Sequence, residues 1–181
     1  AHDAGLAVHM DGARFANAVA HLGCSPAEAS WRAGVDVLSF GATKNGAMAA
    51  EAVIFFDPAK ADDFLFRRKR AGHLFSKMRY LSAQLVAYVR DDLWLDNARH
   101  ANASAQALSE GLAALEGGEL VHPVHANEIF VRLPTAVTSA MRAGGVGFQH
   151  WGNDGQVRFV CAFDTDLADV ERALNIARSA T

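Results

Sequence analysis

Three ionisable side chains follow two short apolar segments early in the chain, at positions where the strands of a sheet would end. Asp11 and Arg14 come directly after the apolar run at 6–10, and Lys44 lies a few residues after the mostly apolar segment at 35–40. In an open α/β sheet, the loops at the carboxyl ends of neighbouring strands face a common crevice in which ligands bind. The sequence therefore predicts a site that combines a carboxylate, a guanidinium and a primary amine.

Each of these side chains also has a simpler explanation. The Asp11 carboxylate could cap the helix that follows it, and Arg14 could be a solvated helix residue. Lys44 lies in the glycine-containing segment 41–46, but Asn45 follows it, and the segment lacks the G-x-x-x-x-G-K-[ST] pattern of a nucleotide-binding P-loop. A P-loop is therefore not expected, and spacing alone leaves both a ligand site and ordinary surface groups open.

The segments around these residues predict an α/β arrangement. Apolar runs indicate strands at 6–10, 35–40 and 52–56, and the pattern between them indicates helices at about 13–21 and from Ser25 to about Gly34. The second helix is predicted from Ser-Pro-Ala-Glu, in which Ser caps the helix, Pro takes its first position and Glu completes a capping box. Strands separated by helices imply parallel pairing and a sheet covered on both faces.

The rest of the chain is predicted to be helical up to about residue 115 and mixed after the break at Gly117-Gly118. The expected elements are helices at 78–89 and 93–115, a strand at 129–133, a helix at 135–143, a strand at 157–162 and a helix at 167–180. This order predicts a larger domain at 1–92 and a smaller α/β domain at 93–181, with the boundary between 90 and 118.

The composition is that of a globular protein and disfavours several classes of partner. Of the 181 residues, 51% are hydrophobic, and the net charge is −3, which favours neither a nucleic acid nor a membrane as partner. The basic run at 67–70 lies beside two aspartates and indicates a solvated helix end. No apolar stretch approaches the roughly 20 residues that span a bilayer. Cys24 and Cys161 form no metal-binding pattern, so reduced thiols in the cytoplasm are expected.

The histidines do not suggest a metal site. His73, His122, His125 and His150 have no metal-ligand spacing. His9 lies in the first predicted strand and points opposite to Met10, and we expect it to be an inner residue with a hydrogen-bond partner rather than a catalyst.

Four segments, in the right order, resemble those of threonine aldolases and related β-eliminating lyases. Residues 8–18 are very similar to the H-x-D-G-A-R segment of that family, and residues 36–47 resemble the segment that contains its Schiff-base lysine. Residues 76–80 and the helix after them also match, as does the segment at 157–161 with the acidic turn and helix that follow. The resemblance runs over essentially the whole chain, but it covers only the second half of such an enzyme.

The resemblance implies a fold and an activity. The fold would be the aspartate-aminotransferase type, pyridoxal 5'-phosphate (PLP) fold type I, with part of the large parallel-sheet domain and the small C-terminal α/β domain. The activity would be that of a PLP-dependent lyase, of the low-specificity L-threonine aldolase type, which cleaves threonine or allo-threonine to glycine and an aldehyde. The alternatives are β-elimination or transamination with the same cofactor, and a catalytically incomplete fragment that acts as a binding module. A homodimer or homotetramer is implied as well.

The resemblance also assigns the two catalytic residues. Lys44 would bind PLP covalently and act as a base once the substrate displaces it. Asp11 would lie against the pyridine nitrogen and keep it protonated, because the protonated ring is the electron sink that stabilises negative charge at the substrate Cα.

Four further residues would bind substrate or cofactor. Arg14 and Arg158 resemble the two arginines that hold the substrate carboxylate, a role that suits the planar, bidentate guanidinium. Arg79 resembles a basic position near the cofactor phosphate. Thr43 could donate to the cofactor phosphate or phenolic oxygen, and is equally well explained as a loop residue.

Overall fold

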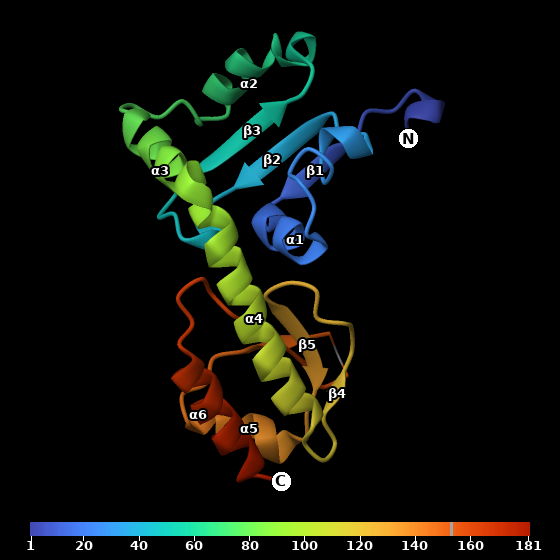
Figure 1. The fold of residues 1–181 in the computed structure, drawn as a ribbon, viewed down its shortest axis with the longest axis vertical. Helices are drawn as coiled ribbons and strands as arrows, with labels where there is room; N and C mark the ends of the chain where they lie inside the picture. Colours follow the sequence, from blue (N-terminus) through green and yellow to red (C-terminus); the bar gives the residue numbers. More distant parts are fainter. Residues whose placement is uncertain (153) are drawn as a thin grey trace. The chain divides into compact units, whose positions relative to one another are not determined.

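A three-stranded sheet organises the first part of the chain in the computed structural model, which describes residues 1–152 and 154–181. β1 (His9–Gly12) pairs in parallel with the central strand β2 (Val37–Gly41), and β3 (Glu51–Phe55) pairs antiparallel with β2 (Figure 1). The parallel pairing of the first two strands is confirmed.

The prediction of parallel pairing is wrong for β3, and the length of the connection explains why. Between β2 and β3 the chain forms only the short 3₁₀ turn η3 (Thr43–Asn45). A parallel connection needs a crossover of about a dozen or more residues, usually through a helix. Residues 42–50 are too few for that crossover, so β3 returns antiparallel beside β2.

An aromatic cluster covers one face of this sheet. Phe40 of β2 lies 6.2 Å from Phe15, 5.8 Å from Trp94 and 5.9 Å from Tyr88, measured between ring centroids. These aromatic rings are nearly fully buried. They belong to β2 and to α1 (Phe15–Leu22), α3 (Arg79–Val89) and the start of α4 (Leu93–Ala113). The chain divides near this point into two compact units, Ala1–Asp96 and Asn97–Thr181.

The helix predicted from Ser25 does not form, although its capping box does. The Glu28 carboxylate accepts hydrogen bonds from the backbone N of Ser25 at 2.8 Å and from its hydroxyl at 2.7 Å. The chain then makes turns and the 3₁₀ segment η2 (Trp31–Ala33), which ends at Gly34 with φ of 96°. Of residues 26–33 only Ser30 is buried, so a helix here would have little packing to offset the cost of its nucleation.

Several short elements complete the first unit. They are η1 (His2–Ala4), η4 (Pro58–Ala61), α2 (Phe64–Arg70) and η5 (Arg90–Asp92). At η5 the chain takes positive φ values at Asp91 and Asp92, which separates α3 from α4 as two helices.

The second unit contains a four-stranded antiparallel sheet in the order β4-β5-β7-β6 (Figure 1). Its inner face packs with α4, α5 and α6 around one core, in which Ile129, Val131 and Val157 are fully buried. The bounds of its strands and remaining helices are β4 (Glu119–Leu120), β5 (Glu128–Arg132), α5 (Thr135–Ala143), β6 (Gln149–Trp151), β7 (Gln156–Val160) and α6 (Leu167–Arg178). Among the residues described, no helix combines the length and apolar character needed to cross a bilayer.

Candidate functional site

Asp11 lies near the carboxyl end of β1, with its side chain exposed. Its Oδ1 accepts a hydrogen bond from the backbone N of Ala13 at 3.0 Å, the interaction that defines an Asx turn. Helix α1 takes Arg14 as its N-cap, so Asp11 shapes the turn and does not occupy the cap position. Within the described part of the chain, the second carboxylate oxygen, Oδ2, accepts no hydrogen bond.

Lys44 lies in η3, just after β2, and its side chain is exposed. Its amine has no hydrogen bond or ion pair with any residue that the structure describes. The neighbouring Thr43 closes the loop: its hydroxyl accepts from the backbone N of Ala50 at 3.1 Å and donates to the Ala50 carbonyl at 3.4 Å. The backbone N of Thr43 donates to Glu51 at 3.3 Å. The loop is thus fixed on one side of Lys44 while the amine stays available.

Asn45 fixes the loop on the other side of Lys44. Its side chain is only 3% exposed, and its Nδ2 donates to the Tyr88 hydroxyl at 2.7 Å and to the Trp94 carbonyl at 2.8 Å. Burial raises the pKa of Tyr88, so its hydroxyl stays protonated at neutral pH. Sequence reasoning missed this residue, because nothing local shows that an amide beside Lys44 is buried against residues more than forty positions later.

The two strand ends are packed directly against each other. A Cβ added to Gly41, at the end of β2, would lie 2.9 Å from the Ala13 Cα, so no side chain fits between the two turns. A Cβ on Gly12 would lie 2.6 Å from the carbonyl oxygen of Ser39. These close approaches place the Asp11 turn and the Lys44 loop side by side at one edge of the sheet, where a ligand can reach both.

Two further polar residues share the face of the sheet that carries Asp11. Asp11 lies opposite Ser39 in the parallel register, and the Ser39 hydroxyl is 2.8 Å from the His9 Nε2. The prediction that His9 is an inner residue is wrong, because its side chain is exposed. Strand alternation turns His9 to the same face as Asp11, and Val53, opposite Ser39, is 42% exposed on that face.

The other predicted residues of the first unit lie at helix starts. Arg14 is half-buried at the N-cap of α1, three residues after Asp11. Arg79 is the first residue of α3, and its side chain is exposed. No cluster of His, Cys, Asp and Glu side chains that could hold a metal ion occurs in the described ranges.

Arg158 lies in the second unit, on β7, and is held from three sides. Its Nε donates to the Glu128 Oε1 at 2.7 Å, and its Nη2 donates to the same oxygen. Its Nη1 donates to the Gln149 Oε1 at 3.0 Å, and its guanidinium carbon lies 5.3 Å from the centre of the Trp151 ring. These three partners were not predicted, since they come from other strands of the sheet.

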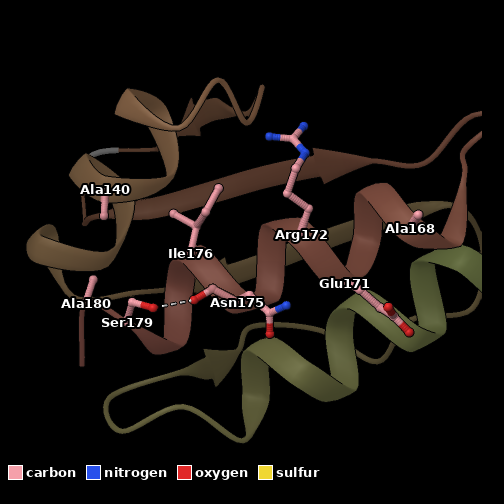
Figure 2. Close-up of a pocket in the computed structure, with 8 residues that line it drawn as sticks. All are labelled: Ala140, Ala168, Glu171, Arg172, Asn175, Ile176, Ser179 and Ala180. Atoms are coloured by element: carbon pink, nitrogen blue, oxygen red, sulfur yellow. Dashed lines mark hydrogen bonds between the residues drawn. The ribbon is translucent and has the colours of Figure 1, made fainter.

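A cavity of about 580 Å³ lies elsewhere in the second unit, beside α5 and α6 (Figure 2). The Ser179 hydroxyl there donates to the Asn175 carbonyl at 2.9 Å, and the Arg172 Nη1 donates to the Gly144 carbonyl at 3.0 Å. None of its lining residues is a predicted site residue, and we assign it no role. The lining residues are Ala140, Ala168, Glu171, Arg172, Asn175, Ile176, Ser179 and Ala180.

Relatives of known activity match nearly the whole chain. A low specificity L-threonine aldolase of Pseudomonas aeruginosa is 51% identical over 174 residues, which are 96% of this chain and 49% of that protein. A second one, from a Pseudomonas species, is 49% identical over 92% of this chain and 48% of its own length. The chain thus spans about half the length of the curated relatives that it matches.

Solved structures and a family model agree with these relatives. A threonine aldolase structure from Leishmania major superposes with a TM-score of 0.88 at 25% identity, covering 98% of this chain and 53% of its own. Tryptophan decarboxylase of Catharanthus roseus, at 16% identity and a TM-score of 0.70, covers 99% of this chain and 45% of its own, and shows the fold alone. The predicted fold type I is therefore confirmed. Because the family model for β-eliminating lyases also matches residues 1–136, this chain belongs to the β-eliminating lyase family.

Proposed function

We propose that this chain supplies the reactive lysine of a PLP-dependent aldehyde-lyase that cleaves threonine or allo-threonine to glycine and an aldehyde. The observation that carries the proposal is the pair at the sheet edge, where the unpartnered amine of Lys44 lies in the loop packed against the Asp11 turn. The identity to two low specificity L-threonine aldolases supports the same reaction.

The donor set at this edge fits PLP. The Asp11 Oδ2 accepts no hydrogen bond within the described residues, so it can accept one from a protonated ring nitrogen. The Lys44 amine is exposed and can bond to an aldehyde carbon. When bound, PLP supplies an electron sink for the electron pair released at the substrate Cα. Thr43 and Arg79 are proposed contacts of its phosphate or phenolic oxygen.

In this proposal two arginines orient the substrate. Arg14 and Arg158 hold its carboxylate, and fixing the carboxylate determines which bond at Cα is aligned for cleavage. A base takes the proton of the β-hydroxyl, the Cα–Cβ bond breaks, the aldehyde leaves and the electron pair stays on the glycine fragment. The Lys44 Nζ, which would act as a base once the substrate displaces it, would pass the proton that it has accepted to Cα to complete glycine.

We also propose a domain organisation, an oligomeric state and a compartment for this protein. Residues 1–92 would be the remainder of the PLP-binding domain and residues 93–181 the small C-terminal domain. A homodimer or homotetramer is proposed from the family resemblance, and light scattering during gel filtration tests it. Both cysteines are free, which supports a reducing compartment such as the cytoplasm.

A substrate panel separates the proposed reaction from its alternatives. With PLP and threonine, the full-length protein should release glycine and acetaldehyde in equal amounts. Serine should not yield pyruvate and ammonia, the products of the β-elimination that the family match keeps open. Pyruvate as the main product would replace the aldolase proposal with a lyase, and no turnover of either substrate would favour a binding module. The Lys44→Ala variant serves as the blank.

A further inference from the structure

Glu128 and Arg158 form an ion pair on one face of the small sheet, opposite the face that packs against α4, α5 and α6. They lie on adjacent strands, β5 and β7, where Arg158 is opposite Phe130, two residues after Glu128 and on the same face. The Arg158 side chain is 17% exposed and the Glu128 side chain is 24% exposed. This pair is therefore better shielded from water than an ordinary surface salt bridge, which contributes little.

The contacts of Arg158 leave part of its guanidinium available. A guanidinium has five N–H donors. Glu128 takes one from Nε and one from Nη2, and Gln149 takes one from Nη1. One donor then remains on each terminal nitrogen. Bidentate recognition of a carboxylate uses two such donors.

We propose that Glu128 is a positioning residue for the substrate carboxylate. Glu128 accepts from Nε and Nη2 of Arg158, and one N–H on each terminal nitrogen stays available for the amino-acid substrate. The inference rests on the proposed function, which assigns Arg158 to that carboxylate. A long arginine side chain loses rotamer freedom when it binds a ligand, and holding it in place beforehand removes that loss from the binding step.

The charge of Glu128 makes the proposal specific. A carboxylate beside the substrate's own carboxylate repels it, so Glu128 serves binding through the position of its acceptor oxygen and not through its charge. Glutamine keeps an acceptor oxygen at that place and removes the charge. Alanine removes both. The two variants therefore separate positioning from electrostatics.

Kinetics on the full-length, PLP-loaded protein tests this. We expect Glu128→Ala to raise the KM for threonine about tenfold with kcat changed less than about twofold, since alignment of Arg158 acts on binding. Glu128→Gln should restore KM to within about threefold of the unmodified protein. An unchanged KM in Glu128→Ala, or an equal rise of KM in both variants, would overturn the proposal.

A more exposed ion pair on the same sheet provides the control. Glu119 on β4 is 3.2 Å from the Nη1 of Arg132 on β5, and it lies directly opposite Arg132 in the register. Glu119→Ala removes one ion-pair partner from an arginine that has no proposed substrate role and that keeps Asp154 as a second partner at 2.9 Å. It should leave both KM and kcat unchanged, and a KM rise like that of Glu128→Ala would overturn the specific role of Glu128.

A second measurement needs neither cofactor nor turnover. In the PLP-free full-length protein, hydrogen exchange at the Arg158 Nε–H, followed by ¹H–¹⁵N NMR, should be at least about tenfold faster in Glu128→Ala than in the unmodified protein, because that bond is lost. Equal exchange rates would show that Glu128 does not hold the Arg158 Nε–H, and would overturn the proposal. Failure of the proposed function is recognised separately, because the unmodified protein would then not cleave threonine at all.

Discussion

The two units of this chain hold their predicted site residues in opposite ways. In the first unit Lys44 has no partner in the described structure, and Asp11 makes one hydrogen bond, to the turn that follows it. In the second unit Arg158 is bonded to Glu128 and Gln149 and lies over Trp151. The chain itself therefore fixes Arg158, whereas Lys44 and Asp11 lie at a sheet edge where a ligand can bind to them.

The two sheets also differ in how far their apolar side chains are buried. Ile129 and Val157 in the second unit are fully buried. In the first unit, Val53 and Ile54 on β3 are 42% and 36% exposed, on opposite faces of the strand. Exposed apolar side chains on a sheet commonly mark surfaces that contact another segment or chain. We therefore expect the first unit to depend more on additional contacts than the second.

The largest expected effect on activity follows removal of the Asp11 carboxylate. Asp11→Ala should lower kcat/KM for threonine about 10³-fold, or about 4 kcal/mol, because the ring nitrogen loses the partner that keeps it protonated. The full-length protein should still take up PLP, which its visible absorbance reports. Activity within about threefold of the unmodified protein would show that Asp11 is not the partner of the ring nitrogen.

Core substitutions test the difference in packing. Ile129→Ala should lower the free energy of unfolding by about 3–4 kcal/mol, as expected when a fully buried side chain leaves a cavity. Ile54→Ala, the matched change on β3, should cost no more than about 1 kcal/mol in this chain because the side chain is already 36% exposed. Urea unfolding measures both, and equal losses would show that the two sheets are covered alike.

Removal of the Asn45 amide, which anchors the loop that carries Lys44, should have an effect of intermediate size on the free energy of unfolding. Asn45→Ala leaves the buried Tyr88 hydroxyl and the Trp94 carbonyl without their donor, and should cost about 2 kcal/mol of unfolding free energy. It should also slow covalent uptake of PLP, because the loop that carries Lys44 is no longer fixed. Tyr88→Phe, which removes one of the two acceptors, is the control and should cost less than Asn45→Ala. An equal cost would show that Asn45 does not hold the loop through both bonds.

Thiol reactivity gives the smallest expected difference and needs no substitution. Burial raises the pKa of Cys161 in the second unit to about 11, which leaves little of the reactive thiolate near neutral pH. Cys24 in the first unit is only half-buried. Iodoacetamide near pH 8 should therefore modify Cys24 first and Cys161 at least about tenfold more slowly. Mass spectrometry of peptides follows both, and similar rates would show that the second unit opens as readily as the first.

The sequence predicted local features better than pairings between distant residues. Apolar runs before Asp11 and Lys44 located the first two strands and their parallel order, because a strand and the turn residues that end it lie within a few positions of each other. The direction of β3 was missed because an apolar run carries no direction, although the short connection at 42–50 could have indicated it. The helix from Ser25 was predicted but does not form, because a capping box forms equally well on a single turn.

The site features that could not be predicted from the sequence depend on contacts between residues far apart in the chain. Glu128 and Arg158 are thirty positions apart, and only the register of β5 with β7 brings them together. Asn45 is buried by residues even further along the chain. The exposure of His9 depends on which face of the sheet is left uncovered, and strand alternation alone does not determine that.

Covalent trapping of PLP on Lys44 is the sharpest test of the proposed function. The full-length protein is incubated with PLP, reduced with borohydride, digested and mapped by mass spectrometry, with Lys44→Ala as the control. We expect a pyridoxyl group on Lys44 in the unmodified protein and none at any site in the variant. A pyridoxyl group on another lysine, or none in the unmodified protein, would contradict it.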